Sequence, residues 1–136
     1  MKKRIRTYKP KTFESTTNTS DTSANIYVSM LLSESWQQLT KNAQILYVYC
    51  KAQYYAEKKK PKPIISHLTS EQQSKCFTMN KTKWLDLYKI YKSDNGQFNK
   101  DIKQLIQFGF IELVECGKFT RTKNIYMLSD KWQQNN

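Results

Sequence analysis

Residues 94–132 read DNGQFNKDIKQLIQFGFIELVECGKFTRTKNIYMLSDKW, and this stretch decides the fold. It contains all three glycines of the chain, Gly96, Gly109 and Gly117. Each glycine stands where a helix followed by a hairpin has to break, and glycine tolerates the positive φ that such breaks often need. The stretch therefore predicts a helix over about 97–108 and, after it, a two-stranded hairpin.

The apolar residues of this stretch support both elements. They recur at helical spacing before Gly109 and give the predicted helix one apolar face. The residues of this apolar face are Phe98, Ile102, Leu105 and Ile106. After Gly109, the expected first strand carries Phe110, Ile111, Leu113 and Val114, and the expected return strand spans 125–128. The tip between them is basic. A helix followed by a basic hairpin is the arrangement with which a winged helix binds DNA.

The polar face of the predicted helix and the hairpin tip supply the candidate DNA-binding residues. The major groove is wide enough for one helix, and its base edges present a distinguishable pattern of donors and acceptors. Glutamine and asparagine can pair with adenine, whereas lysine and arginine favour guanine. Cations on the tip can reach backbone phosphate or a narrow minor groove. The candidates are Gln97, Asn99, Lys100, Lys103, Gln104 and Gln107 on the helix, and Lys118, Thr120, Arg121 and Lys123 on the tip.

Position along the helix ranks these candidates. Recognition helices usually contact bases with their N-terminal residues, which places Gln107 below the other five. An ordinary solvated helix face is the alternative for all six, and the basic hairpin beside the helix favours DNA contact.

Composition and charge agree with a nucleic-acid partner. The chain has 136 residues, which predicts one domain, and a formal net charge of +12 with a pI near 9.6. Such a charge is typical of proteins that bind a polyanion, and anionic membrane is the competing partner. No apolar run approaches the ~18 residues of a membrane span, and the basic start KKRIR precedes no apolar signal sequence. We therefore expect a cytoplasmic protein without membrane contact.

Signatures of catalysis and of cofactor binding are missing from the sequence. Three widely spaced cysteines and one histidine, His67, offer no zinc-ligand spacing and no disulfide framework. The cysteines are expected to be buried or half-buried thiols. There is no glycine-rich phosphate loop and no G-x-S-x-G motif. Since a DNA nickase normally needs a cluster of metal-binding histidines, we expect no enzyme activity and no cofactor.

Two segments outside the helix and hairpin are also basic. Residues 1–24 combine six cations with a serine- and threonine-rich run and are predicted to be a disordered tail, serving either as an arm on DNA or as a solubility segment. Residues 57–63, EKKKPKP, are predicted to be a loop. This loop is either simply solvated or a second segment that contacts phosphate. Residues 25–133 form the expected folded domain.

Further helices are expected within that domain. Thr40 is a plausible N-cap for a helix whose apolar stripe is Ala43, Leu46, Tyr47, Cys50 and Tyr54. A short strand is predicted around Phe77 and Met79, and residues 64–76 can add one helical turn. A helix over about 81–92, with Trp84, Leu87, Tyr88 and Tyr91 on one face, would then precede the turn at 93–96. The fold class expected is α+β: a winged helix-turn-helix with three or more helices and a C-terminal β-hairpin wing.

The chain resembles the winged-helix DNA-binding proteins of Gram-positive plasmids, phages and integrative conjugative elements. Three patterns carry the resemblance: LTKNAQILY at 39–47, FNKDIKQLIQFGFI at 98–111 and IYMLSDKW at 125–132. The first also resembles the start of plasmid replication initiators. The resemblance implies an accessory protein that binds specific double-stranded DNA in conjugative transfer, at the origin of transfer within a relaxosome, or in plasmid replication. It leaves open a relaxase, a replication initiator or a second copy of the chain as protein partners.

Three other interpretations remain open from the sequence. A small transcriptional regulator with the same fold would bind a promoter instead of an origin. A winged helix can also serve protein contact, in which case the lysines only aid solubility. RNA binding is disfavoured, because single-strand RNA readers expose an aromatic platform and most aromatics here fit core stripes.

Overall fold

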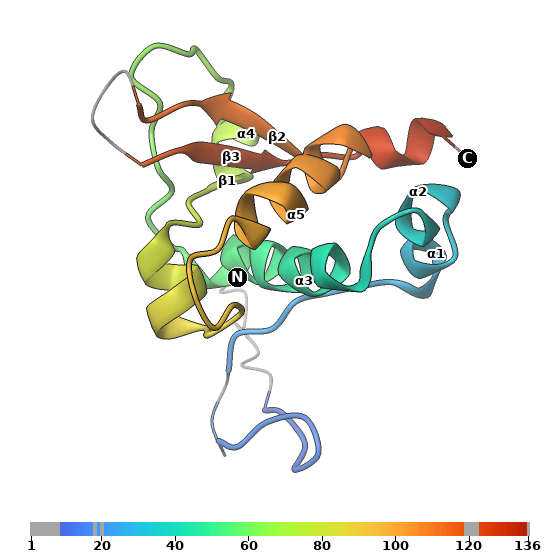
Figure 1. Cartoon of the computed structure of the whole chain (residues 1–136). Coiled ribbons are helices and arrows are strands. Elements are labelled where there is room, and N and C mark those ends of the chain that lie inside the picture. The colour runs from blue at the N-terminus through green and yellow to red at the C-terminus, as the bar shows by residue number, and fades with distance from the viewer. Residues whose placement is uncertain (1–8, 18, 20, 119–122, 136) are drawn as a thin grey trace, which may run out of the picture.

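The protein has an α+β fold in which helices precede a small antiparallel sheet (Figure 1). The computed structural model describes residues 9–17, 19, 21–118 and 123–135. Its elements are α1 (Val28–Leu31), α2 (Glu34–Gln37), α3 (Lys41–Ala56), α4 (Ser70–Ser74), β1 (Cys76–Phe77), the π-helical turn η1 (Thr82–Leu87), α5 (Gln97–Gln107), β2 (Ile111–Glu115), β3 (Ile125–Leu128) and the 3₁₀ turn η2 (Lys131–Asn135).

The sheet has three strands in the order β1-β3-β2, so that β3 is central. β2 and β3 form the predicted C-terminal hairpin, with Leu113 opposite Tyr126 and a bulge between Leu113 and Glu115. β1 pairs with the other side of β3, where Phe77 lies opposite Tyr126. The hairpin prediction is therefore confirmed, and the short strand expected near Phe77 becomes the third strand of the same sheet.

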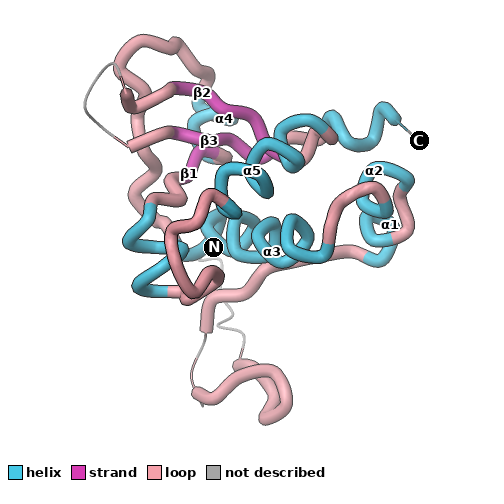
Figure 2. The backbone as a smooth tube through the Cα atoms, in the orientation of Figure 1, coloured by secondary structure: helices cyan, strands magenta, loops and turns pink. Residues whose placement is uncertain are grey.

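α3 and α5 lie against each other and carry the sheet at one end (Figure 2). The predicted N-cap of α3 is confirmed, because the Thr40 hydroxyl accepts a hydrogen bond from the Ala43 amide at 3.3 Å. The predicted stripe of α3 is buried up to Cys50. Its last member is wrong: Tyr54 is 39% exposed and Gln53 is buried instead. Gln53 is retained there because its amide donates to the Tyr88 hydroxyl at 2.8 Å.

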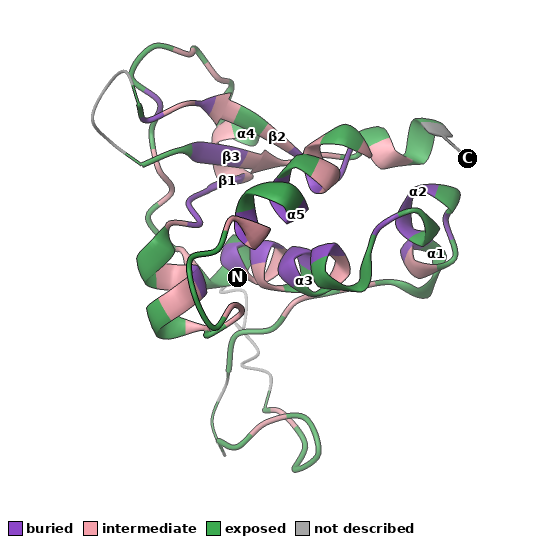
Figure 3. Ribbon diagram, in the orientation of Figure 1, coloured by how far each residue is buried: buried purple, intermediate pink, exposed green. Residues whose placement is uncertain are grey.

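An aromatic cluster joins both ends of the folded region to α3. Trp36 of α2 and Tyr47 of α3 pack edge-on against Phe110, with ring centroids 5.6 and 5.3 Å away. Trp132 of η2 stacks on the other side of Phe110 at 5.7 Å. Burial of such rings is a large part of the stabilisation of a small core. Figure 3 shows the buried residues of α3 and α5 turned toward one another and the exposed ones turned outward.

The α-helix predicted over 81–92 is only partly present, as a short π-helical turn. Only η1 is helical there, and the Tyr88 amide donates to the Lys83 carbonyl, five residues back. Lys89 then takes a left-handed φ of 54°, and irregular backbone continues to α5. Because the wide π turn rotates side chains off the α-helical stripe, Leu87 is 62% exposed. Packing explains the distortion: it places Trp84 and Tyr91 edge to face at 5.5 Å.

The N-terminal segment precedes the first helix. Residues 1–8, 18 and 20 of the predicted tail lie outside the described residues, and the described part of 9–24 contains no helix or strand. One turn is present, in which the Glu14 amide donates to the Lys11 carbonyl at 2.8 Å. No helix within the described ranges is both long and apolar enough to cross a membrane.

Candidate nucleic-acid interface

Two glycines set the ends of α5, as the sequence predicted. Gly96 is its N-cap with a φ of 87°, and the Asn95 side-chain oxygen accepts from the first helical amide, that of Gln97, at 3.1 Å. Gly109 follows the helix with a φ of 85°, and a Cβ at this position would lie 2.6 Å from the backbone nitrogen of Trp132. Both positions therefore need glycine, and the second also allows η2 to pack against the end of α5.

The inner face of α5 fixes the orientation of the helix. Phe98, Ile102 and Leu105 are buried as predicted, while Ile106 is half-buried. Asp101 is fully buried between them. Its carboxylate accepts from the Tyr91 hydroxyl at 2.5 Å and from the Gln97 amide at 2.8 Å.

The Tyr91 hydroxyl belongs to the segment that precedes α5. Burial and the hydrogen bond to Asp101 raise the pKa of Tyr91, so the hydroxyl remains a donor throughout the physiological pH range. Trp84 of η1 stacks on Phe98 with ring centroids 5.0 Å apart. These contacts tie η1 and the segment after it to the first turn of α5.

The outer face of α5 presents four of the six predicted residues together. Asn99, Lys103 and Gln107 are spaced by four residues, which places them along one side of the helix, and Lys100 lies beside Asn99. All four are exposed. The helix therefore offers two cations and two amide groups on one rigid surface.

The other two predicted helix residues are already engaged within the protein. Gln104 is half-buried, accepts from the Thr40 amide at 3.1 Å and donates to the Thr40 hydroxyl at 3.2 Å. Gln97 is half-buried and donates to Asp101 at 2.8 Å. A bidentate adenine contact by Gln104 would use the same amide oxygen and nitrogen that now hold α5 to the start of α3. The structure thus places Gln97 and Gln104 where they position the helix.

The structure describes two of the four predicted hairpin residues. Lys118 and Lys123 are exposed, whereas Thr120 and Arg121 lie outside the described residues. The Asn124 side-chain oxygen accepts from the Gly117 amide at 2.7 Å, which links the two sides of the hairpin. One of the two acids of β2 is neutralised, because Glu112 forms an ion pair with Lys131.

A hollow connects the start of α5 to the hairpin. It is a pocket of about 300 Å³ bordered by Asn99 of α5, Asn124 of the hairpin and Lys81 next to η1. An exposed ion pair between Lys81 and Asp94, 3.3 Å long, lies at the same pocket. An exposed pair of this kind contributes little to stability. The helix and the hairpin therefore border one polar depression.

The cysteines agree with the sequence prediction. Cys50 and Cys76 are buried and Cys116 is half-buried, and all three are free thiols. Burial raises the pKa of Cys50 and of Cys76, so both remain protonated near neutral pH. No group of three or more histidine, cysteine or acidic side chains within the described ranges could hold a metal ion.

Sequence reasoning missed two acidic residues that organise this region, Asp101 and Glu115. Position 101 lies three residues after Phe98 and four before Leu105, on the apolar stripe itself. That spacing could have indicated a buried carboxylate with local partners. Glu115 is also buried, with 6% of its surface exposed, and its partners are the backbone amides of Ile64 and Ile65. Nothing in the local sequence indicates those partners, which are about fifty positions away.

Comparisons of the chain with protein-family models, with curated proteins and with solved structures give no match. The resemblance to winged-helix proteins therefore rests on the three sequence patterns given for it.

Proposed function

We propose that the chain is a sequence-specific double-stranded DNA-binding protein of the winged helix-turn-helix type. In this proposal α5 enters the major groove and the β2–β3 hairpin is the wing. The element order supports it: α3, the short α4, β1, η1, α5 and then a hairpin whose return strand β3 lies between β1 and β2. η1 would take the place of the first helix of the motif. This order puts a helix with a polar outer face directly before a basic hairpin.

One observation carries the proposal. The exposed residues Asn99, Lys100, Lys103 and Gln107 share one side of a helix whose other side is locked by buried contacts. A rigid helix bearing amide and cationic groups has the chemistry that base edges recognise in the major groove. The exposed lysines of the hairpin supply charge for backbone phosphates, which fix position without reading sequence. We assign base contact to these four residues and a positioning role to Gln97 and Gln104.

The biological process is proposed from the sequence resemblance. We infer an accessory protein of a bacterial mobile element that acts in conjugative transfer, at the origin of transfer within the relaxosome, or in plasmid replication. Its protein partner would be a relaxase, a replication initiator or a second copy of the chain. The alternative is a small winged-helix transcriptional regulator. The location of the bound site, in an origin or in a promoter, separates the two.

Selection of bound duplexes from a random library at ~150 mM salt tests the proposed function. Specific affinity for the selected duplex should be around 10⁻⁸ M or somewhat weaker, as for a single DNA-binding module. A duplex of the same composition with the site shuffled should bind much more weakly. If the selected and shuffled duplexes bind equally across ~50–200 mM salt, sequence-specific binding is contradicted.

The Asn99→Ala variant adds a control for the surface. It should retain binding to the shuffled duplex and lose preference for the selected one. A matched substitution at an exposed position of the segment before α5, Lys92→Ala, should leave the preference unchanged.

A further inference from the structure

The lysine-rich loop at 57–63 is attached to the folded protein through Glu57, through Lys60 and through the residues that follow it. In the middle of the loop, the Lys60 ammonium turns inward and donates to the Gln53 and Tyr54 carbonyls at 3.1 and 2.7 Å, which caps the end of α3. Burial lowers the pKa of Lys60. The acid of the loop also turns inward, because Glu57 pairs with Lys83 at 2.7 Å. The loop therefore has a defined path and its acid does not offset its outer lysines.

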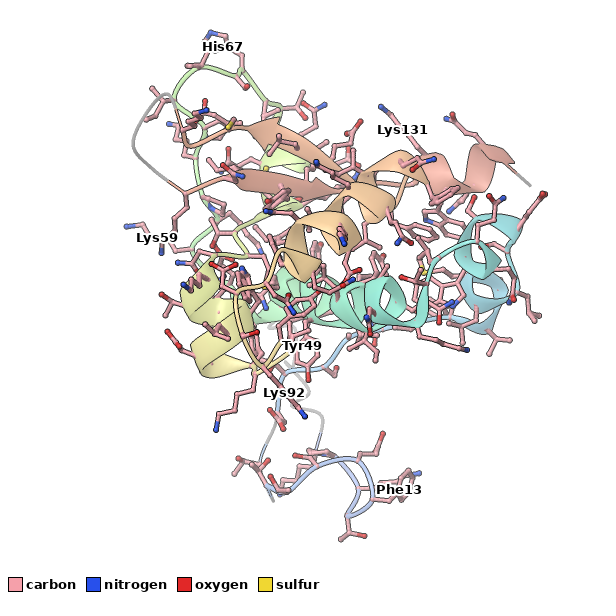
Figure 4. All side chains as sticks on the ribbon, viewed as in Figure 1. Phe13, Tyr49, Lys59, His67, Lys92 and Lys131 are labelled. Carbon is pink, nitrogen blue, oxygen red and sulfur yellow. The ribbon has the colours of Figure 1, made fainter. Side chains whose placement is uncertain are left out.

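Three lysines of this loop remain turned to solvent: Lys58, Lys59 and Lys62. The ion pairs found among the described residues do not include any of them. Figure 4 shows Lys59 projecting outward on the same side of the view toward which the hairpin extends. The outer surface of the loop is therefore positively charged and has no acidic partner among the pairs of the described region.

Glu115 fastens the following residues to the hairpin. Its carboxylate accepts from the Ile64 amide at 2.9 Å and from the Ile65 amide at 2.7 Å. These two backbone hydrogen bonds hold the pKa of Glu115 below its usual value. The neighbouring Val114 carbonyl accepts from the Ser66 hydroxyl at 3.2 Å. The β2 bulge falls at these residues, so their polar groups bind the loop as well as the strand ladder.

The loop and the hairpin enclose a common depression of about 480 Å³. Pro61, Ile64 and Ile125 give it an apolar lining, and the exposed Lys62 and Lys123 contribute one cation from each side. Glu115 also lines it, with its carboxylate occupied by the two loop amides. A nucleic-acid backbone has matching chemistry, because apolar sugar faces alternate with phosphates.

We propose that loop residues 58–62 and the facing side of the hairpin form a second contact surface for the sugar–phosphate backbone of duplex DNA. The surface lies beyond the hairpin from α5 and takes the backbone that flanks the base pairs contacted by α5. Glu115 is its positioning residue. The inference rests on the proposed function, since it extends the same DNA contact to flanking backbone.

Two variants with equal charge change test the surface. Lys59→Gln with Lys62→Gln removes two cations from it, and Lys89→Gln with Lys92→Gln removes two exposed cations from the segment before α5. The probe is the selected duplex extended by ~10 base pairs, about one helical turn, on each side. Each neutralised phosphate contributes about 0.9 to the slope of log affinity against log salt, so the loop variant should lower the slope by about 1.8. The control should keep the parental slope, and neither should change base preference.

The Glu115→Gln variant tests positioning separately. An amide of the same size offers one oxygen in place of two and turns an N–H donor toward backbone donors. Amide hydrogen exchange at Ile64 and Ile65 should accelerate, and the salt slope should fall in the direction of the loop variant. A parental slope for the loop variant on the extended duplex, with parental binding intact, overturns the second surface and leaves the proposed function standing. A parent that prefers no duplex contradicts the proposed function and this inference together.

Discussion

Two regions of the molecule differ in how their polar groups are held. One is α5, and the other is the lysine-bearing surface formed by the hairpin and the neighbouring loop. On α5, the exposed groups of Asn99 and Lys103 project from a helix with buried anchors on its opposite side. On the hairpin and loop, Lys123 and Lys62 border a wide depression at the edge of the sheet. A rigid face can distinguish base edges, whereas mobile cations on long side chains bind phosphate in any sequence. The comparison teaches that specificity and affinity can reside in separate parts of one small fold.

The first prediction concerns the buried residues that hold α5 in place. Leu105 is fully buried on the inner face, and Leu105→Ala should lower the free energy of unfolding by about 2–5 kcal/mol, because it removes apolar contacts and leaves a cavity. Urea denaturation followed by circular dichroism measures the change. Lys103→Ala, two residues away on the outer face, is the control and should change stability by less than about 0.5 kcal/mol. Equal destabilisation by both would mean that α5 has no inner and outer face.

The second prediction concerns the contribution of the hairpin cations to DNA affinity. A triple variant should lower the slope of log affinity against log salt by about 2–3, if each cation neutralises one phosphate. In this variant alanine replaces Lys118, Arg121 and Lys123. Arg121 lies outside the described residues and is included on sequence grounds. The affinity for every duplex should fall by a similar factor, and the far-ultraviolet circular dichroism should not change. A variant that folds normally and binds its site as tightly as the parent would show that α5 alone carries recognition.

A single α5 substitution should have a smaller and more selective effect. Lys100→Ala should weaken binding to the best site by about 1–3 kcal/mol and relax preference at particular base pairs. Affinity measurements on a panel of singly substituted duplexes provide the test. Lys118→Ala is the counterpart on the hairpin and should weaken every duplex of the panel alike. If both variants show the same profile over the panel, the division of roles between helix and hairpin is wrong.

The smallest effect is expected at Gln104. Because its amide bridges to Thr40, Gln104→Ala should lower the free energy of unfolding by about 0.5–1.5 kcal/mol. Base preference should be retained, in contrast to Lys100→Ala. Altered preference at one base pair with unchanged stability would return Gln104 to the set of base-contacting residues that the sequence suggested.

Local signals were sufficient for much of the fold. Thr40 caps α3, Gly96 and Gly109 set the ends of α5, and the apolar runs after Gly109 form the hairpin, because each feature depends on neighbours within a few residues. The fold class α+β follows from these elements, and the winged helix-turn-helix assignment stays a proposal. For the candidate site, four of the six predicted helix residues are exposed on the outer face of α5, and their contact with DNA stays a prediction.

The remaining features depend on contacts between distant residues. The periodicity around Trp84 predicted an α-helix, and packing against Phe98 and Tyr91 produced a π turn and an exposed Leu87 instead. Polar sequence positions do not show whether a side chain is free, so Gln104 could not be separated from Gln107 before Thr40 was placed beside it. The hydrogen bonds from the residues after the lysine loop to Glu115 could not be predicted either, because they join positions far apart in the sequence.

Amide chemical-shift mapping with the selected duplex tests the central claim most directly, because it reports on the whole chain in one titration. The account predicts saturable shifts along α5 from Asn99 to Gln107 and in the hairpin around Lys118 and Lys123, with α1, α2 and η2 unaffected. Shifts confined to α1, α2 or the outer side of α3, with α5 and the hairpin unchanged at saturation, would contradict it.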